Sequence, residues 1–350
     1  MSYELRDLEL DKDRSFLVEI LENNLNFLNG ADNVINWNNI KSKYPAQCMA
    51  LEHHDGNNKI QRIGNICTFY RDFNYLGKRF KVGIFGNLVI DEKHRSLQPA
   101  LKLTKGNAQK AVDELPFIYV FPNEKAIGVF KLSGFKQVGD LVRYAYISSY
   151  NQFLGEKLPV IGNIAGTAID LIRNLFSSIR YSVIANDYIS DVEKTFPDNI
   201  NVLFKKSILS KLICNYRDNA YMTWRYLDNP EYDFTILNSY RFNDSGKIHV
   251  ATCVFNVENN VLFIRDLLFD NRKSFNIVIG AVKKWAIKND IKSISIRYMG
   301  TPVLINLLQL NGFHSRESGR VVVTKSNSSS MLKELTNSNN WFILDGDEDI

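Results

Sequence analysis

The segment NLVIDEKHRSLQPALKLTKG, residues 87–106, carries the clearest chemical signal in the chain. An apolar strand runs into a basic turn, and Pro99 follows as a suitable first residue of a helix, because its missing N–H would have no helical partner. The backbone N–H groups at a helix start are unpaired and carry the positive end of the helix dipole, so they can bind a phosphate or pyrophosphate group. Arg95, Lys93 and Lys102 add positive charge nearby. The segment therefore predicts a phosphate-binding turn, with an ordinary basic strand-to-helix turn as the alternative.

The second half of the chain holds side chains suited to a second anionic ligand. Guanidinium groups match the geometry of a diphosphate, and aromatic rings stack on a base or a sugar. The candidates for binding this ligand are Trp224, Arg225, Tyr226, Arg265 and Arg297. Structural ion pairs for the arginines and core packing for the two aromatic residues are the alternatives.

The composition is that of a globular protein with a hydrophobic core, because 45% of the 350 residues are apolar and 23% are charged. A net charge of +5 is too weak to indicate a nucleic-acid partner, and an acidic small molecule would account for it. The charged N-terminal segment MSYELRDLELDKDRS is unlike a signal peptide. The most apolar run, residues 158–172, is too short to span a bilayer and contains Asp170. We expect a cytoplasmic protein without stable membrane insertion.

The four cysteines are scattered along the chain, at Cys48, Cys67, Cys214 and Cys253. None forms a C-x-x-C pair, and none lies beside a histidine at the spacing of metal ligands. We therefore expect buried, reduced cysteines and no metal site.

The elements that must position the candidate residues follow one plan twice. In the first half, apolar strands near 47–53, 61–71 and 79–90 precede a helix, a strand, a helix and further strands. The second half repeats three strands, a helix, a strand, a helix and a strand, and a Gly-Phe pair stands at matching places, 134–135 and 312–313. A duplication of one α/β unit of roughly 150 residues explains this repeat economically.

The repeat predicts an α/β fold with two tandem domains, each a mixed, twisted sheet flanked by helices. We expect the first domain at residues 1–150, a linker helix at 151–180 and the second domain at 181–350. The number of copies of the chain in the working protein is not readable from the sequence.

The turn after the first set of strands resembles the phosphate-binding turn of the GNAT acyltransferase superfamily, V-x-x-x-x-(Q/R)-x-x-G-x-(G/A). Ile90, Arg95 and Ala100 match this pattern, and Gln98 replaces its first glycine. The resemblance implies two GNAT-like domains and acyl-CoA as a co-substrate in the first of them. The residues that it implies for the cofactor here are Leu88, Val89, Ile90, Arg95, Ser96, Leu97, Gln98, Pro99 and Ala100.

A second motif of the same superfamily follows one strand later, in NEKAIGVFKLSGF. Asn123 matches a position that commonly contacts the pantetheine–phosphate region of CoA. Phe130 stands where many members carry a tyrosine that protonates the leaving thiolate, and phenylalanine cannot donate a proton. The second half has Thr301 and Leu308 at these two places and no glycine in its turn DNRKSFN, although Asn271 and its neighbours could still meet an anion. It therefore resembles a degenerate copy, and we expect the acyl-CoA in the first half.

Two further segments, RDNAYMTWRYLDNPEYDF and NWFILDGDEDI, resemble parts of acyltransferases from bacterial surface-polysaccharide gene clusters. This resemblance implies that the acceptor is an amino sugar carried on a nucleotide diphosphate. N-acylation needs a neutral amine, a polarised thioester carbonyl and an acceptor for a proton. Backbone N–H groups near residues 88–89 could polarise the carbonyl.

The strand before the turn offers Asn87 and no glutamate as a base, so the candidates lie elsewhere. His53 and His54 are candidates because histidine is the side chain suited to proton transfer near neutral pH, but HHDGNN also reads as an exposed hairpin tip. Asp266 alternates with apolar neighbours on a strand and faces either a cleft or solvent.

Two other functions fit the same motifs. Tandem GNAT-like domains also occur in aminoacyl or peptidyl transferases that build cell-wall cross-bridges, although no basic run with interleaved aromatic residues supports a tRNA site here. A non-catalytic CoA-binding protein would account for Phe130, Asn87 and Gln98 together.

Overall fold

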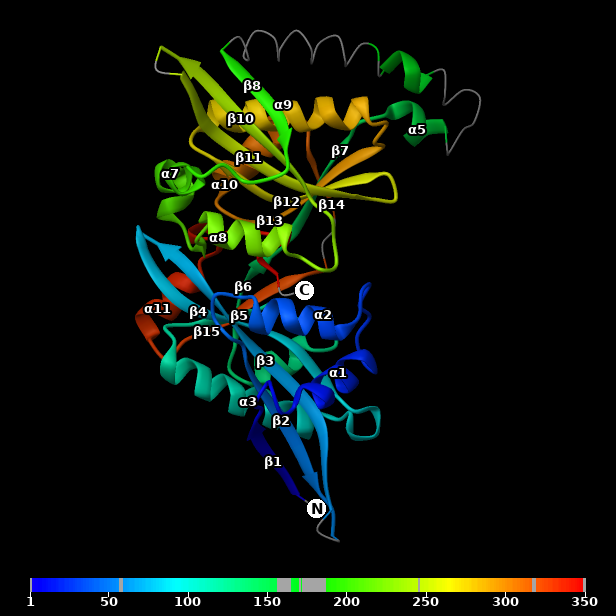
Figure 1. The fold of residues 1–350 in the computed structure, drawn as a ribbon, viewed down its shortest axis with the longest axis vertical. Helices are drawn as coiled ribbons and strands as arrows, with labels where there is room; N and C mark the ends of the chain where they lie inside the picture. Colours follow the sequence, from blue (N-terminus) through cyan, green and yellow to red (C-terminus); the bar gives the residue numbers. More distant parts are fainter. Residues whose placement is uncertain are drawn as a thin grey trace.

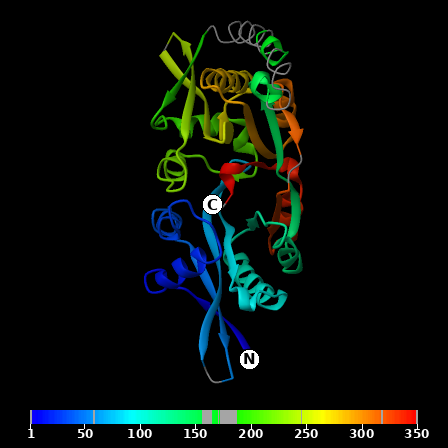
Figure 2. The same ribbon diagram turned by 90° about the vertical axis from the view of Figure 1, so that its right-hand side faces the viewer.

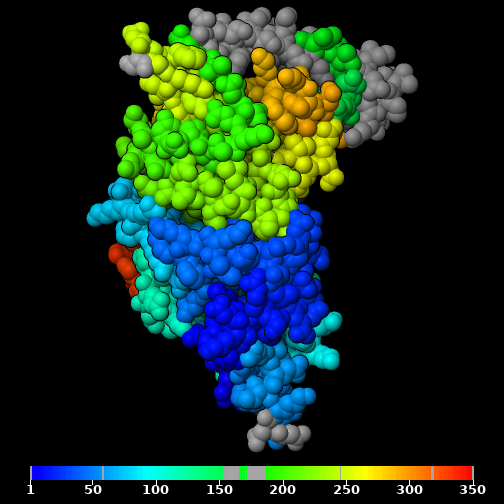
Figure 3. All heavy atoms as spheres, in the orientation of Figure 1, coloured from blue at the N-terminus to red at the C-terminus, as the bar shows by residue number. Residues whose placement is uncertain are grey.

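The computed structural model describes residues 2–56, 59–155, 165–169, 171, 187–244, 246–316 and 319–348. It has two β-sheets, one above the other along the long axis, and the C-terminal end lies between them (Figure 1; Figure 2). The two halves meet along a continuous boundary in the space-filling view (Figure 3). Most of the predicted linker helix at 151–180 lies outside the described residues.

The first half contains the elements β1 (Ser2–Asp7), α1 (Arg14–Glu22), α2 (Ala31–Ile35), the π-helical η1 (Asn36–Ile40), β2 (Gln47–His54), β3 (Ile60–Tyr75), β4 (Lys78–Ile90), η2 (Glu92–His94), α3 (Leu97–Glu114), β5 (Ile118–Val120), α4 (Ile127–Leu132), β6 (Lys136–Asp140), β7 (Val142–Ile147) and α5 (Tyr150–Gly155). The three strands predicted near 47–53, 61–71 and 79–90 are confirmed as β2, β3 and β4.

The second half contains β8 (Tyr188–Glu193), α7 (Ile200–Lys206), η3 (Ile208–Lys211), β9 (Cys214–Asn215), α8 (Asn219–Met222), the π-helical η4 (Thr223–Leu227), β10 (Thr235–Asn243), β11 (Gly246–Glu258), β12 (Val261–Phe269), α9 (Arg272–Lys288), β13 (Ser293–Gly300), α10 (Pro302–Leu310), β14 (His314–Arg316), β15 (Val321–Lys325), α11 (Ser329–Leu335), η5 (Ser338–Asn340), β16 (Phe342–Leu344) and η6 (Asp345–Asp347).

The two sheets have the same order of seven strands, and in each the sixth strand comes from the other half. The first runs β1-β2-β3-β4-β5-β15-β6 and the second runs β8-β10-β11-β12-β13-β7-β14, with β9 and β16 as extra strands on β3 and β13. In each sheet the fourth and fifth strands are parallel, whereas the borrowed strand is antiparallel to both its neighbours. The predicted α/β fold with two mixed sheets is confirmed. The division at residues 151–180 stays a prediction, because β7 and β15 each complete the sheet of the opposite half.

Helices cover both faces of the first sheet. Leu17, Leu21 and Ile35 of α1 and α2 pack with Phe69 and Ile84 on one face. On the other face, apolar residues of α3 and α4 pack against the alternate side chains of the same strands. This alternation follows from the two-residue period of a strand, and it leaves only the ends and edges of the sheet for a ligand.

The cysteines differ from the expectation in one respect. Cys48 and Cys67 face each other across the antiparallel pair β2·β3, with Cα atoms 4.2 Å apart, and form a disulfide. Cys214 and Cys253 are buried and free. The prediction of four reduced cysteines was therefore wrong for the first pair, because strand register, and not sequence spacing, brought their side chains together.

Candidate functional site

The two parallel strands at the centre of the first sheet separate soon after they meet. β4 and β5 pair at Gly83↔Ile118 and Ile84↔Tyr119. Beyond Ile84, β4 continues to Ile90 with a ladder to β3 alone within the described part of the chain. Because alternate peptide groups of an antiparallel strand face away from its partner, this stretch of β4 presents backbone N–H and C=O groups toward β5.

A β-bulge lies within this stretch of β4. Two residues of β4, 87 and 88, lie opposite one residue of β3, 66, between the pairs Cys67↔Gly86 and Asn65↔Val89. Asn87, at the bulge, has a φ of 55°, and its carbonyl accepts a hydrogen bond of 3.2 Å from the side-chain Nδ2 of Asn65. The bulge reorients the peptide groups beside the three residues predicted to hold the acyl end of the cofactor, which are Leu88, Val89 and Ile90.

The start of α3 has backbone N–H groups that no described residue caps. The side chain of Ser96, the residue before the helix, makes no capping hydrogen bond. The N–H groups of Leu97 and Gln98 have no acceptor among the described residues, and Pro99 has no N–H to satisfy. Gln98 is helical and has no positive φ, so this turn does not require the glycine of the family pattern. Ser96, Leu97 and Gln98 are exposed, so the predicted phosphate-binding amides face solvent.

Two of the three cations predicted beside this turn have protein partners. Arg95 donates from Nε to the carbonyl of Ile90 at 3.3 Å and from Nη2 to Oδ1 of Asn24 at 2.7 Å. The Lys102 ammonium donates to the carbonyl of Tyr3. Arg95 therefore braces the connection between β4 and α3, while its positive charge remains beside the helix start. Ala100 completes the first turn and is half-buried.

Two residues of the second motif have structural roles. Asn123 accepts a hydrogen bond from the backbone N–H of Ala126 at 2.9 Å and so starts the turn that leads into α4. Phe130 is only 2% exposed, and its ring packs against the ring of Phe135 with centroids 5.2 Å apart. Phe130 thus belongs to the core between α4 and the sheet, which explains why a phenylalanine stands there.

The two predicted histidine bases lie at the end of β2, two strands away from the gap between β4 and β5. The His53 ring lies 4.7 Å from the ring of His94 in η2 and 5.3 Å from that of Tyr3. His54 Nε2 lies 3.6 Å from a carboxylate oxygen of Glu4. These histidines therefore flank the connection that precedes α3 and are not placed beside the bulge.

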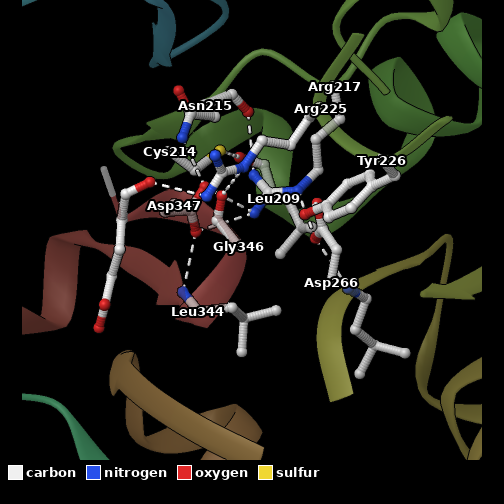
Figure 4. A network of polar contacts seen from close by, with 12 residues as sticks. Leu209, Cys214, Asn215, Arg217, Arg225, Tyr226, Asp266, Leu344, Gly346 and Asp347 are labelled. Carbon is white, nitrogen blue, oxygen red and sulfur yellow. Dashed lines mark hydrogen bonds and ion pairs between the residues drawn. The ribbon is translucent and has the colours of Figure 1, made fainter. Parts of the chain in front are cut away.

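The third predicted base, Asp266, lies in a buried ion network (Figure 4). Its carboxylate accepts a hydrogen bond from Arg217 Nε at 2.7 Å and another from the Tyr226 hydroxyl at 2.8 Å. Arg217 Nη2 also donates to both carboxylate oxygens of Asp347, at 3.0 and 3.1 Å, and Asn215 donates to Asp347 at 2.6 Å. Burial raises the pKa of Asp347, although the Arg217 guanidinium opposes that shift. Asp266 is 1% exposed, so it faces neither solvent nor an open cleft.

The three predicted diphosphate-binding arginines contact the C-terminal segment of the chain itself. Arg225 donates to the carbonyls of Gly346 and Glu348, at 2.8 and 2.7 Å. Arg265 and Arg297 lie 3.2 and 3.6 Å from the carboxylate of Asp345. Burial raises the pKa of Asp345, although these two cations oppose that shift. The arginines thus hold the C-terminal residues 345–348, and no pattern in the sequence indicated that the two segments meet.

Trp224 forms a matched pair with Trp37 between the two halves. The rings stack with centroids 4.8 Å apart, and each indole N–H donates to the backbone carbonyl of the other residue, at 2.7 and 3.0 Å. Each tryptophan is the second residue of a π-helix, η1 in the first half and η4 in the second. Trp224 and Tyr226 are both buried, so they pack in the interior, and the sequence analysis missed Trp37.

The same C-terminal segment fills the gap between the parallel strands of the second sheet. β12 and β13 pair as far as Ile264↔Ile296, and beyond that point β16 pairs with β13, at Tyr298↔Leu344 and the next two residues. A methyl group added to Gly346 would lie 2.1 Å from the Tyr226 hydroxyl, so the segment fits closely. In the second sheet, the C-terminal segment therefore occupies the gap between the parallel strands. In the first sheet, among the described residues, the edge of β4 at the corresponding gap is unpaired.

The helix that follows β12 also differs from α3. Oδ1 of Asn271 accepts hydrogen bonds from the backbone N–H groups of Lys273 and Ser274, at 2.8 and 3.1 Å. These bonds satisfy the donors that an anion would need at the start of α9. The possibility that Asn271 and its neighbours receive an anion is therefore not supported by this arrangement.

Comparison with known proteins rests on structure alone. The sequence matches no protein-family model and no curated protein. Similar solved structures include a conserved protein from Enterococcus faecalis V583 described as a probable N-acyltransferase (TM-score 0.64, 9% identity, 95% of this chain and 74% of that one). They also include a GCN5-related N-acetyltransferase from Anabaena variabilis ATCC 29413 (0.62, 12%, 95% and 75%) and Saccharomyces cerevisiae N-myristoyltransferase with bound myristoyl-CoA (0.53, 11%, 92% and 82%). The chain thus has the two-sheet fold of GCN5-related N-acetyltransferases. No helix among the described residues is both long and apolar enough to cross a membrane.

Proposed function

We propose that the chain is an acyl-CoA-dependent N-acyltransferase that acts on the amine of a nucleotide-linked amino sugar in bacterial surface-glycan biosynthesis. The observation that carries the proposal is the uncapped start of α3 next to a bulged stretch of β4 that, among the described residues, is unpaired on one side. The acyl-CoA belongs to the first half, residues 1–150, and the second half, residues 181–350, contributes to the acceptor site. The protein would work in the cytoplasm.

Two features of the first half support a CoA site there. The exposed N–H groups of Leu97 and Gln98 suit a pyrophosphate, because they carry the positive end of a long helix. The free edge of β4 suits the amide groups of a pantetheine chain, which can pair with it as a strand would. In the second half, Asn271 caps the corresponding helix, and the C-terminal segment fills the corresponding gap between strands.

The chemistry needs one polarised carbonyl and one neutral amine. Backbone N–H groups near Leu88 and Val89 donate to the thioester oxygen as negative charge develops on it. The amine nitrogen attacks the carbonyl carbon, the carbon–sulfur bond breaks, and the proton lost from nitrogen balances the thiolate as a CoA thiol. Because His53, His54 and Asp266 lie away from the bulge, the proposal assigns the rate enhancement to orientation and carbonyl polarisation.

The proposal is tested with acetyl-CoA and a panel of nucleotide-linked amino sugars, with mass spectrometry of the product and a thiol assay. Arg95→Ala should weaken CoA binding about tenfold, on the order of 1.4 kcal/mol, because it removes charge and a brace from the turn. Arg14→Ala is the matched control, since Arg14 pairs with Asp32 on α1 and α2. An unchanged CoA affinity in Arg95→Ala would remove the first-half site.

A non-catalytic CoA-binding protein is the second candidate. The observation that favours it is the burial of Phe130 together with the displacement of the three predicted bases from the bulge. Thermal stabilisation by CoA without thiol release on any amine of the panel would establish this alternative.

A further inference from the structure

A cavity of about 170 Å³ lies between the two halves, beside the paired tryptophans. The first half lines it with the connection from η1 to β2, with β3 and with the start of β4, and the second half lines it with residues around α8. Its lining residues that carry the argument are Lys43, Arg71, Asp72, Arg79, Asp218 and Trp224. None of the residues predicted for the CoA turn lines it, so this cavity is separate from the donor site.

The lining carries an excess of positive charge. Lys41, Lys43, Arg71 and Arg79 stand against two carboxylates, those of Asp72 and Asp218. Asp72 accepts from Lys43 Nζ at 2.6 Å and from the Tyr44 hydroxyl at 2.9 Å, and Arg79 lies against both carboxylates. Burial acts to raise the pKa of Asp72, but the hydrogen bonds from Arg79, Lys43 and Tyr44 outweigh it, so its pKa is lowered and the group stays ionised. The two carboxylates therefore hold Lys43 and Arg79 in place, and the lining keeps an excess of two positive charges.

Aromatic rings also contact two of these cations and one neighbouring lysine. The Arg71 guanidinium lies 4.4 Å from the ring centroid of Trp224, and that of Arg79 lies 4.2 Å from the ring of Tyr216. Lys81 Nζ, next to the cavity, lies 3.9 Å from the ring of Tyr70. Stacking on a ring face restricts a long basic side chain, so the positive charges are ordered before any anion arrives.

We propose that this cavity binds a phosphate or diphosphate group of the acceptor. The inference rests on the proposed function and names the part of the acceptor that the second half recognises. At about 30 Å³ for each water molecule, the cavity holds roughly six, which suits a diphosphate and not a whole nucleotide sugar. The rest of the acceptor lies outside it.

The test is titration calorimetry with uridine diphosphate and, separately, with CoA. Lys43→Met should weaken uridine diphosphate binding about tenfold and leave CoA binding unchanged. Lys12→Met is the matched control, because Lys12 is an exposed lysine that pairs with Glu9 away from the cavity. Wild-type protein that does not bind uridine diphosphate, or binding that Lys43→Met does not alter, overturns the proposal.

Kinetics separate this proposal from the function on which it rests. With a nucleotide-linked amino sugar as acceptor, Lys43→Met should raise KM about tenfold with little change in kcat, and Lys12→Met should change neither. Uridine diphosphate binding that depends on Lys43, in a protein without acyl transfer, would support the cavity and refute the enzyme. Acyl transfer with the same KM in the wild-type protein and in Lys43→Met would support the enzyme and refute the cavity as the acceptor site.

Discussion

Each of the two similar sheets has a gap where its parallel strands separate. The gap between β4 and β5 is open, whereas the C-terminal segment fills the gap between β12 and β13. In the first half, among the residues that the structure describes, the N–H groups that begin α3 lack a cap, and β4 beyond Ile84 has no partner on the side of β5. In the second half, Asn271 caps α9, and the segment from β16 to η6 lies against β13 and β12. The difference teaches that, of two similar sheets in one chain, one can leave this gap open while the other fills it with its own chain.

The closed gap is held by charge as well as by strand pairing. Arg217 lies between Asp266 and Asp347, and all three side chains are buried. Buried ions are stable only with partners, so this network fixes the C-terminal segment in one position. The open gap has no such network in the described part of the chain, which is what a site for an exchangeable ligand requires.

The largest expected effect comes from breaking the network of the closed gap. Arg217→Met should lower the free energy of unfolding by about 3–5 kcal/mol, because it leaves the carboxylates of Asp266 and Asp347 buried without their cation. Urea denaturation measures the change, and Arg241→Met is the control, because Arg241 is an exposed residue of β10. A loss below about 1 kcal/mol would mean that strand pairing alone holds the segment.

An intermediate effect on the free energy of unfolding is expected in acid, from a buried histidine of the second half. His249 in β11 is 5% exposed, and burial lowers its pKa to about 4, below the ordinary 6.5. Because the folded-state pKa is the lower one, the stability contributed by neutral His249 is complete above pH 6.5 and is lost as the pH falls toward 4. The loss at pH 5 should be about 2 kcal/mol.

His249→Gln measures this contribution, because glutamine keeps polar atoms and does not titrate. The difference in unfolding free energy between pH 7 and pH 5 should be smaller in the variant than in the wild-type protein. Equal differences would show that His249 does not contribute to the loss of stability in acid.

The smallest expected effects test the two helix starts directly. Ser96→Asp should raise the free energy of unfolding by about 0.5–1 kcal/mol, because a carboxylate caps the free amides of α3. The same change should weaken CoA binding at least tenfold, since the carboxylate occupies the phosphate position. Stability and affinity therefore move in opposite directions.

Asn271→Ala is the counterpart in the second half. It should lower stability by about 1 kcal/mol through loss of the cap, and it should leave CoA affinity unchanged. Denaturation and calorimetry on both variants give the comparison. Equal losses of CoA affinity in the two variants would contradict the assignment of the donor to the first half.

Local features of the fold were predictable from the sequence. The helix α3, the three strands before it and the Gly-Phe pairs follow from short-range preferences, although α3 begins at Leu97 and Pro99 is its third residue and not its first. Gly134 and Gly312 have φ angles of 88° and 76°, the left-handed conformation that ends α4 and α10 at matching places. Such signals depend on a few neighbouring residues, and a single sequence contains them.

The roles of the charged candidates were not predictable in the same way. Asp266 was interpreted as a possible base and Arg265 as a possible ligand for a diphosphate, yet Asp266 pairs with Arg217 and Arg265 pairs with Asp345. Arg217 and Asp347 are 130 residues apart in the chain. Spacing over such a distance carries no information about contact, so an ion pair and a binding site look alike in sequence.

The sequence by itself determined that the chain contains two α/β units and that, in the first, an apolar strand runs through a basic turn into a helix. Only the tertiary structure decided that β7 joins the second sheet, that β15 joins the first, and that the C-terminal segment closes the second gap. The physical reason is that helix starts and strand alternation are set by adjacent residues, whereas strand pairing and burial of charge are set by whichever distant segment completes the hydrogen bonds.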